Sequence, residues 1–341
     1  MKNRHIILIV LLSVLQLLPA CTKKGETIIT SFPQQKTLQA KIKHVPSPFL
    51  VPRYIGITGD YLFIYKEREE FLFSFFRLPD ADFIADSGNR GQGPDDFNLL
   101  DTRSFYPTQD GFNVVEAGTN FLKTVSYDGK NLKTIHSKNI LEQGISNNGL
   151  YPLTDSTFLT LGWLDEDNEY RILNSKSGQT TTTYPYPKWI DKHLKPSDPP
   201  LFVTFLKSCV VHPDGKKVAA FYSRFKRIRI YDNTMNILHD IEVQIPPYNT
   251  FFDNPIEKQP VYYIGQPYAT KNYIYALCAN NQPAQVSSRD YELQVWDWNG
   301  KAIACYKLDR KLTLMTISEE HRKIYALDNA VADEIYIYDL P

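Results

Sequence analysis

Residues 213–232 read PDGKKVAAFYSRFKRIRIYD, and this stretch contains the unit from which most of the chain is built. The polar turn Pro213-Asp214-Gly215 precedes a strand-like segment at 217–222 that is rich in aromatic and β-branched residues. A second such segment, 227–232, ends in another turn residue. Asp-Gly and Asn-Gly pairs tolerate positive φ and close tight hairpins, so the stretch predicts neighbouring antiparallel strands.

The same unit recurs with a period of about 40 residues, which is typical of radially repeated sheets. Its first half is a polar turn followed by an aromatic strand, and it occurs six times, at 58–65, 109–116, 154–163, 213–222, 270–277 and 319–327. Its second half is a strand ending in a turn, at 121–130, 170–178, 227–236, 293–301 and 334–340. Radial repetition explains a fixed period, whereas a Greek-key arrangement does not. We therefore predict an all-β fold, a six-bladed β-propeller of four-stranded antiparallel blades. A pair of β-sandwiches or an open β-solenoid is the alternative.

The sixth unit lacks an outer strand, because 334–341 supplies only a third one. Residues 37–45 alternate apolar and polar side chains, as a half-buried edge strand does. A ring leaves unpaired edges where its ends meet, and an N-terminal strand can cover one of them. We therefore expect residues 37–45 to pair beside 334–340 and close the ring.

The first twenty residues have the order of a secretory signal. Lys2 and Arg4 precede an apolar run over 6–18, and small residues stand directly before Cys21. This pattern predicts cleavage and lipidation at Cys21; an uncleaved anchor or a plain signal peptide is the alternative. The predicted organisation is a signal peptide at 1–20, a tether at 21–36 and a single propeller domain at 37–341. Residues 22–26 lack a run of acids, which favours the periplasmic leaflet of the outer membrane over the cell surface.

Charge excludes one class of partner. The 38 Lys and Arg residues balance the 38 Asp and Glu residues, so the chain has no basic field to hold a nucleic acid.

Three cysteines follow Cys21, and an odd number cannot all pair within the chain. Cys209, Cys278 and Cys305 each stand in an apolar run. We expect buried thiols rather than a disulfide.

Two stretches resemble known families. VVHPDGKKVAAFYSRFKRIRIYD (210–232) resembles the Pro-Asp-Gly repeat of TolB-type propellers, and GNRGQGPDDF (88–97) resembles the junction that opens a blade in NHL-type propellers. With the lipidation box, they resemble the TolB-like six-bladed propeller lipoproteins of Gram-negative anaerobes. The consensus of these families at this junction is Gly-Pro-Gly-Glu-Phe. This chain has Gly93-Pro94-Asp95-Asp96-Phe97 instead, with one glycine lost. The resemblance implies the fold and an envelope location, and it supplies no catalytic residues.

The sequence offers little catalytic chemistry. The seven histidines are scattered without the spacing of a zinc site, and no Gly-x-Ser-x-Gly elbow occurs. The acidic run at 165–169 lacks the glycine and the distant glutamate of a calcium loop. We therefore predict no metal, no cofactor and no catalytic residue. The expected function is non-catalytic binding or scaffolding at the envelope. The alternatives are a metal-dependent lactonase- or lyase-type propeller enzyme and a glycan-binding surface protein.

The two ends of the ring differ in their connections. The turns between first and second strands and between third and fourth strands are short, and we call the end that they form the tight-turn face. The second-to-third turns and the connections between blades are long and varied; they form the loop-rich face. Recognition usually resides in long loops on a rigid scaffold. We therefore predict that a protein, peptide or glycan docks on the loop-rich face, with these ligand-binding candidates: Arg90, Arg224, Lys226, Trp189 and Tyr186.

Overall fold

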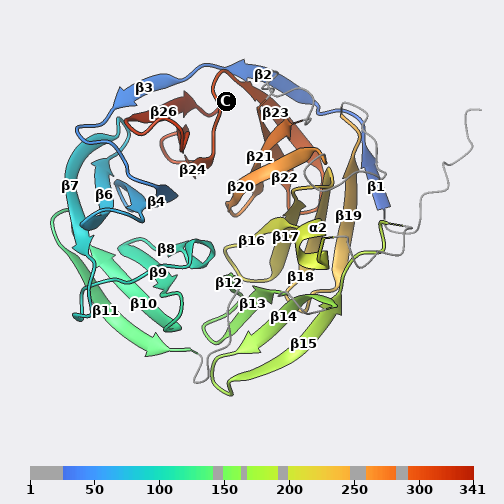
Figure 1. Cartoon of the computed structure of the whole chain (residues 1–341). Coiled ribbons are helices and arrows are strands. Elements are labelled where there is room, and N and C mark those ends of the chain that lie inside the picture. The colour runs from blue at the N-terminus through green and yellow to red at the C-terminus, as the bar shows by residue number, and fades with distance from the viewer. Residues whose placement is uncertain (1–25, 141–148, 163–166, 191–198, 246–258, 282–290) are drawn as a thin grey trace, which may run out of the picture.

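Six β-sheets stand around a common axis, one for each predicted repeat (Figure 1). The computed structural model describes residues 26–140, 149–162, 167–190, 199–245, 259–281 and 291–341. In each sheet the first strand of the blade lies beside the axis and the later strands follow outward toward the rim. The chain is a six-bladed β-propeller with four-stranded antiparallel blades, as its repeat predicts.

The strands of each blade follow one another from the axis outward. Blade 1 contains β4 (Pro52–Thr58), β5 (Tyr61–Lys66), β6 (Phe71–Arg77) and β7 (Asp82–Asn89). Blade 2 contains β8 (Tyr106–Pro107), β9 (Gly111–Val115), β10 (Phe121–Tyr127) and β11 (Leu132–Asn139). Blade 3 contains β12 (Leu150–Pro152), β13 (Thr157–Leu161), β14 (Asn168–Asn174) and β15 (Gln179–Pro185). Blade 4 contains β16 (Lys207–Val211), β17 (Lys217–Tyr222), β18 (Arg227–Asp232) and β19 (Ile237–Val243). Blade 5 contains β20 (Val261–Ala269), β21 (Tyr273–Asn281), β22 (Glu292–Asp297) and β23 (Ala302–Leu308). Blade 6 contains β24 (Leu314–Ser318), β25 (Lys323–Leu327) and β26 (Glu334–Asp339). Two short helices, η2 (Thr102–Ser104) and α2 (Leu201–Thr204), precede β8 and β16.

The N-terminal segment runs around the rim of three blades (Figure 1). β3 (Lys41–His44) pairs antiparallel with β26 and is the missing fourth strand of blade 6, which confirms the predicted closure. β2 (Gln34–Leu38) adds to β23 as a parallel fifth strand of blade 5. β1 (Glu26–Ile29) adds to β19 of blade 4 in the same way. Strands that pair with the blades thus already occur within the segment 21–36, which the sequence predicts as a tether.

Glycine is required where neighbouring blades meet closely. Gly215, in the first turn of blade 4, has a φ of +73°, which disfavours other residues. A Cβ there would lie 2.1 Å from the carbonyl oxygen of Leu153 in blade 3. The Pro-Asp-Gly turn therefore serves both the hairpin and the packing of its blade against the preceding one.

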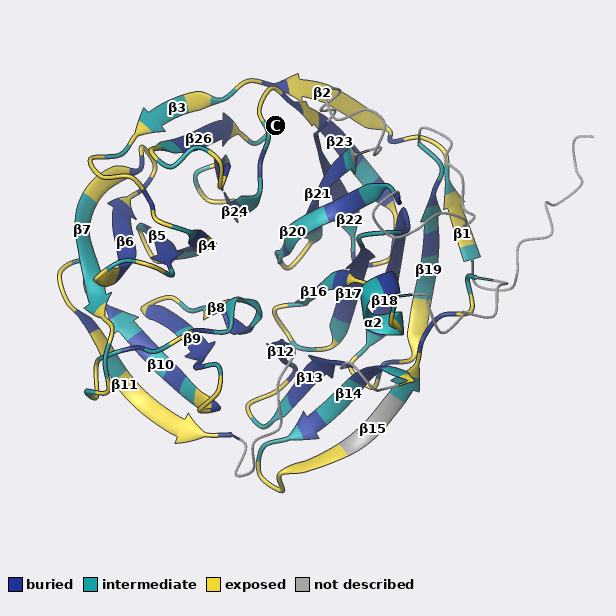
Figure 2. Ribbon diagram, viewed as in Figure 1, coloured by how far each residue is buried: buried dark blue, intermediate teal, exposed yellow. Residues whose placement is uncertain are grey.

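Apolar side chains fill the spaces between blades. Figure 2 shows buried residues concentrated in the middle strands, while β2 and β11 are largely exposed. Each pair of neighbouring blades encloses one apolar cluster. Among the described residues, the cluster between blades 2 and 3 has the fewest buried members, namely Val115, Ile140, Leu150, Phe158 and Leu173.

The three cysteines that follow Cys21 are buried free thiols. Cys209 lies in the cluster between blades 3 and 4. Cys278 and Cys305 lie in the cluster between blades 4 and 5. Their expected role as small buried hydrophobic residues is confirmed.

Candidate functional site

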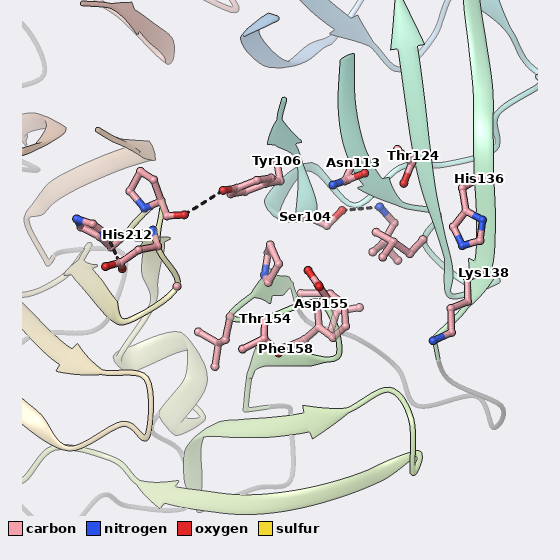
Figure 3. A pocket seen from close by; sticks show the side chains of 18 residues that line it. Ser104, Tyr106, Asn113, Thr124, His136, Lys138, Thr154, Asp155, Phe158 and His212 are labelled. Atoms are coloured by element: carbon pink, nitrogen blue, oxygen red, sulfur yellow. Dashed lines mark hydrogen bonds and ion pairs between the residues drawn. The ribbon is translucent and has the colours of Figure 1, made fainter. Parts of the chain in front are cut away.

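A cleft of about 700 Å³ lies where blades 2 and 3 face each other (Figure 3). Its walls come from β9, β10 and β11 of blade 2 and from β12 and β13 of blade 3. The first turns of blades 3 and 4, at 153–155 and 212–215, line its inner end. Because these are first-to-second strand turns, the cleft reaches the tight-turn face. Its volume is within the range of small-molecule sites in proteins.

The wall formed by blade 2 is polar. Tyr106, Asn113, Thr124 and His136 are paired across β8, β9, β10 and β11, so they form one row from the axis to the rim. Residues paired directly across a sheet project on the same face. Figure 3 shows these side chains along one side of the cleft. Blade 2 therefore presents a line of hydrogen-bonding groups to the cavity.

The centre of this row holds an unsatisfied polar atom. The side-chain Oδ1 of Asn113 is buried and has no hydrogen-bond partner among the described residues. A buried polar atom without a partner costs about 1–3 kcal/mol. A ligand that donates a hydrogen bond to this oxygen would remove that cost.

The opposite wall and the floor are apolar. Pro152 and Phe158, paired between β12 and β13, form the wall from blade 3. Val115, Leu122 and Leu150 close the cleft toward the loop-rich face. A flat ligand could thus stack on one wall and form hydrogen bonds with the other.

Hydrogen bonds between blades fix the inner end. The hydroxyl of Tyr106 donates to the carbonyl of Pro213 at 3.2 Å, which links blade 2 to blade 4. The Nε2 of His212 lies 3.0 Å from the carbonyl oxygen of Lys271 in blade 5, and its Nδ1 lies 2.6 Å from Asp214 Oδ1. The backbone N–H of Lys216 also donates to Asp214 and holds the pKa of that carboxyl below its ordinary value. Both His212 nitrogens are engaged, so His212 has a structural role here.

Charged groups lie at opposite ends of the cleft. Lys138 and His136 stand on the rim strand β11, whereas Asp155 stands in the turn between β12 and β13 beside the axis. Figure 3 shows Lys138 at the β11 side and Asp155 beside Thr154. Among the described residues, none of these three side chains has an ion-pair partner. The cleft is therefore cationic at the rim and anionic at the axis.

The structure brings two of the five candidates from the sequence close together. Tyr186 and Trp189 both pack against Phe205 in the cluster between blades 3 and 4. The ring centroid of Phe205 lies 5.4 Å from that of Tyr186 and 6.0 Å from that of Trp189. The guanidinium groups of Arg227 and Arg229 lie 4.7 and 4.4 Å from the Trp189 ring centroid. Tyr186 is buried and Trp189 is partly exposed.

The other three candidates bind backbone carbonyls, and two of them, Arg224 and Lys226, flank Phe225, whose ring lies 5.3 Å from that of Trp189. Arg224 donates to the carbonyl of Gln259 at 3.3 Å. Lys226 is fully buried and donates to the carbonyl of Ile245. Arg90 is exposed in blade 1 and donates to the carbonyl of Glu67. None of the five candidates lines the cleft.

A buried polar network underlies the Trp189 region. Glu169 and Lys207 form an ion pair at 3.0 Å with both side chains almost fully buried. The hydroxyl of Tyr222 donates to Glu169 at 2.8 Å, and burial raises the pKa of Tyr222 well above its ordinary value. Removing one partner of such a pair typically costs 3–5 kcal/mol because it leaves the other charge uncompensated. The network therefore joins blades 3 and 4, and it includes one acid of the 165–169 run, Glu169, which is buried.

The sequence reasoning also missed the cleft, although a signal for it was present. The segment FLKTVSY (121–127) alternates, with Leu122, Thr124 and Ser126 on one face. In an alternating strand, the polar side chains are ordinarily expected to face solvent. In a blade enclosed between two neighbours, a polar face indicates an internal cavity instead.

Neither a metal centre nor a membrane-spanning helix is found in the part of the chain that the structure describes. They contain no group of three His, Cys, Asp or Glu side chains placed to hold a metal ion. No helix in this part of the chain has the length and apolar character needed to cross a membrane. The predicted lipidation site, Cys21, lies outside the described residues.

Comparisons with known proteins agree with this architecture. The crystal structure of a Bacteroides fragilis protein thought to be exported is similar, with 12% identity, a TM-score of 0.54 and coverage of 92% of this chain and 100% of that chain. A Bacteroides vulgatus member of the DUF4221 family has 9% identity, a TM-score of 0.53 and coverage of 88% and 98%. At these identities the likeness concerns the fold. A search of curated proteins found no match. The model of the TolB-like 6-blade propeller-like family matches residues 30–320, which is most of the sequence. The chain therefore belongs to the TolB-like six-bladed propeller family.

Proposed function

We propose that the protein is a non-catalytic binding protein of the bacterial envelope that holds a small polar molecule in the cleft between blades 2 and 3. The observation that carries this proposal is the unpartnered, buried Oδ1 of Asn113 in the polar row of blade 2, opposite the apolar wall of Phe158. Protein sites for small molecules combine apolar walls with a few placed polar groups in this way.

The envelope location has separate support. A secretory signal precedes Cys21 in a lipidation box, and the similar Bacteroides fragilis protein is thought to be exported. The proposed arrangement is a lipid anchor at Cys21 in the periplasmic leaflet of the outer membrane. Mass spectrometry of the mature protein would show an acylated N-terminal cysteine. An unmodified N-terminus would overturn the anchor.

Thermal-shift screening tests the binding site. The probes are free amino acids, di- and tripeptides, mono- and disaccharides and small organic acids. Thr124→Trp places a large ring in the centre of the cleft and should abolish any ligand-induced rise in Tm. Ser137→Trp is the matched control, because Ser137 is exposed on β11 and pairs with Lys123 in the row that faces blade 1. The cleft proposal is wrong if no probe stabilises the wild type, or if Thr124→Trp retains the full shift.

A second surface remains a candidate for a protein or peptide partner on the loop-rich face. The observation in its favour is Trp189, which is partly exposed and is contacted by Arg227 and Arg229. Trp is enriched among residues that dominate binding energy at protein interfaces, and the two buried, ion-paired arginines hold its ring in place. The variant Trp189→Ala should weaken capture of a partner by the lipidated protein without altering the thermal shift from cleft ligands. Unchanged capture by this variant would remove Trp189 from the interface.

A further inference from the structure

We propose that the ligand of the cleft is a short peptide with a free ammonium group and a free carboxylate at its two ends. This inference rests on the proposed function and narrows it to one chemical class. Its basis is the juxtaposition of an unpaired lysine at the rim, an unpaired acid at the axis and an unsatisfied amide oxygen between them.

The cationic end has a fixed position in the sheet. Lys138 pairs with Leu122 and His136 pairs with Thr124, so both side chains belong to rows that face the cleft. Within the described chain, no carboxylate lies within ion-pair distance of either residue. Lys138 is exposed at the edge of the cleft, and its ammonium group attracts a carboxylate there. The rim end therefore suits the carboxyl terminus of a ligand.

The two acids at the anionic end, Asp214 and Asp155, differ in whether they already have partners. Asp214 is held by Nδ1 of His212 and by the backbone N–H of Lys216, so it belongs to its own turn. Asp155 is exposed in the first turn of blade 3, and no described cation lies within ion-pair distance of it. Asp155 is thus the group available for a ligand ammonium.

The dimensions of a blade limit the ligand length. Four neighbouring strands span three gaps of about 4.8 Å, so the axis and rim strands lie about 14 Å apart. The side chains of Lys138 and Asp155 occupy part of this distance. An extended peptide advances about 3.3–3.6 Å per residue, so two or three residues match the space that remains.

The middle of the cleft suits a peptide backbone. Asn113 Oδ1 can accept a hydrogen bond from a peptide N–H, and the Thr124 hydroxyl can donate to a peptide carbonyl. Phe158 and Pro152 offer an apolar surface for a ligand side chain. A neutral sugar could also use these middle groups, but it would leave both charged ends without partners. The charged ends therefore distinguish the two ligand classes.

Isothermal titration calorimetry with the tripeptide Ala-Phe-Ala tests the inference. N-acetylation of the peptide and amidation of its carboxyl group should each weaken binding to the wild type about two- to fivefold, since each removes one contact with an exposed charged side chain. Lys138→Met should bind the free acid and the amide equally. Asp155→Asn should bind the free amine and the acetylated peptide equally.

Two matched variants control for general effects of charge. Lys307→Met changes an exposed lysine on β23, which is the fourth strand of blade 5. Asp110→Asn changes the acid in the first turn of blade 2, where it does not line the cleft. Both should retain the wild-type preference for the doubly charged peptide.

The possible failures can be told apart. If the blocked peptide Ac-Ala-Phe-Ala-NH₂ binds as tightly as the free one, or if only a disaccharide binds and Thr124→Trp abolishes it, the dipolar ligand is wrong and the cleft proposal stands. If no probe of any class binds the wild type, both proposals fail.

Discussion

Blade 2 has two faces that are built differently from the same strands. Toward blade 1 it presents Phe112, Val125 and Tyr127, which join a cluster of thirteen buried apolar residues. The rings of Phe63 and Phe112 stack there, with their centroids 4.7 Å apart. Toward blade 3 it presents Asn113 and Thr124, and a cleft remains.

This difference shows how a propeller can create a binding site without a long loop. Successive residues of a strand point to opposite faces, so a change at every second position alters one interface and leaves the other intact. A tightly packed interface on one side keeps blade 2 in place while the other side stays open. The inter-blade cleft is therefore compatible with a stable ring.

The largest effect is expected from removing residues 22–45, which contain all three rim strands of the N-terminal segment. Loss of β3 exposes the edge of β26, and loss of β1 and β2 uncovers blades 4 and 5. We expect a larger fall in Tm than from any single substitution below. If the interface between blades 2 and 3 is the weakest, hydrogen exchange should rise first in β12.

A shorter deletion is the control for this prediction. Removing residues 22–31 takes away β1 and leaves β2, β3 and the buried Phe32 in place. It should lower Tm much less. An unchanged Tm after the long deletion would show that the N-terminal segment does not hold the ring closed.

The next largest loss of stability is expected from truncating a side chain on the face of blade 2 that packs against blade 1. Phe112 is fully buried and contacts Phe63 and Phe73, at ring-centroid distances of 4.7 and 5.2 Å. Phe112→Ala should lower the free energy of unfolding by about 3–5 kcal/mol, because it removes apolar contact and leaves a cavity. Denaturant titration of the two proteins measures the difference.

The adjacent residue gives the matched comparison. Asn113→Leu replaces a side chain of similar size whose buried Oδ1 lacks a partner in the described structure. The free energy of unfolding should change by less than about 1 kcal/mol. Equal losses at 112 and 113 would contradict the difference between the two faces of blade 2.

The sequence predicts the architecture better than the site, and the reason is physical. Turns such as Pro213-Asp214-Gly215 and alternating aromatic strands are local signals, so the six blades can be counted without a structure. Closure by β3 follows from the absent fourth strand of blade 6. The cleft depends on which face of a strand meets which neighbour, and Tyr106, Asn113, Thr124 and His136 meet only through pairing across four strands.

The predicted binding residues illustrate the same limit. In the sequence, Arg224, Lys226 and Arg227 stand around Phe225, a pattern typical of a charged loop at a hairpin tip. In the structure Lys226 is fully buried, and its ammonium group donates to the carbonyl of Ile245 and lies 5.8 Å from the ring centroid of Tyr262. Charge at a hairpin tip thus does not by itself indicate an accessible group. Whether these residues bind a partner stays a prediction.

The smallest structural perturbation gives the last prediction, which uses thiol reactivity to compare the two faces directly. Thr124 is partly exposed to the cleft, and its neighbour Val125 is buried against blade 1. At pH 8 a cysteine at 124 should react with a maleimide at least about 100-fold faster than a cysteine at 125, which can react only after local opening. Mass spectrometry of labelled peptides follows both rates.

The native thiols should give little background in this experiment. Burial raises the pKa of Cys209 and of Cys278 to about 12, and burial also raises the pKa of Cys305. Because the thiolate is the reactive form, the three native cysteines stay protonated and unlabelled at pH 8 while the protein is folded. Equal labelling at 124 and 125 would mean that the interface between blades 2 and 3 is as closed as its neighbour. Protection of the cysteine at 124 by Ala-Phe-Ala would instead place that peptide in the cleft.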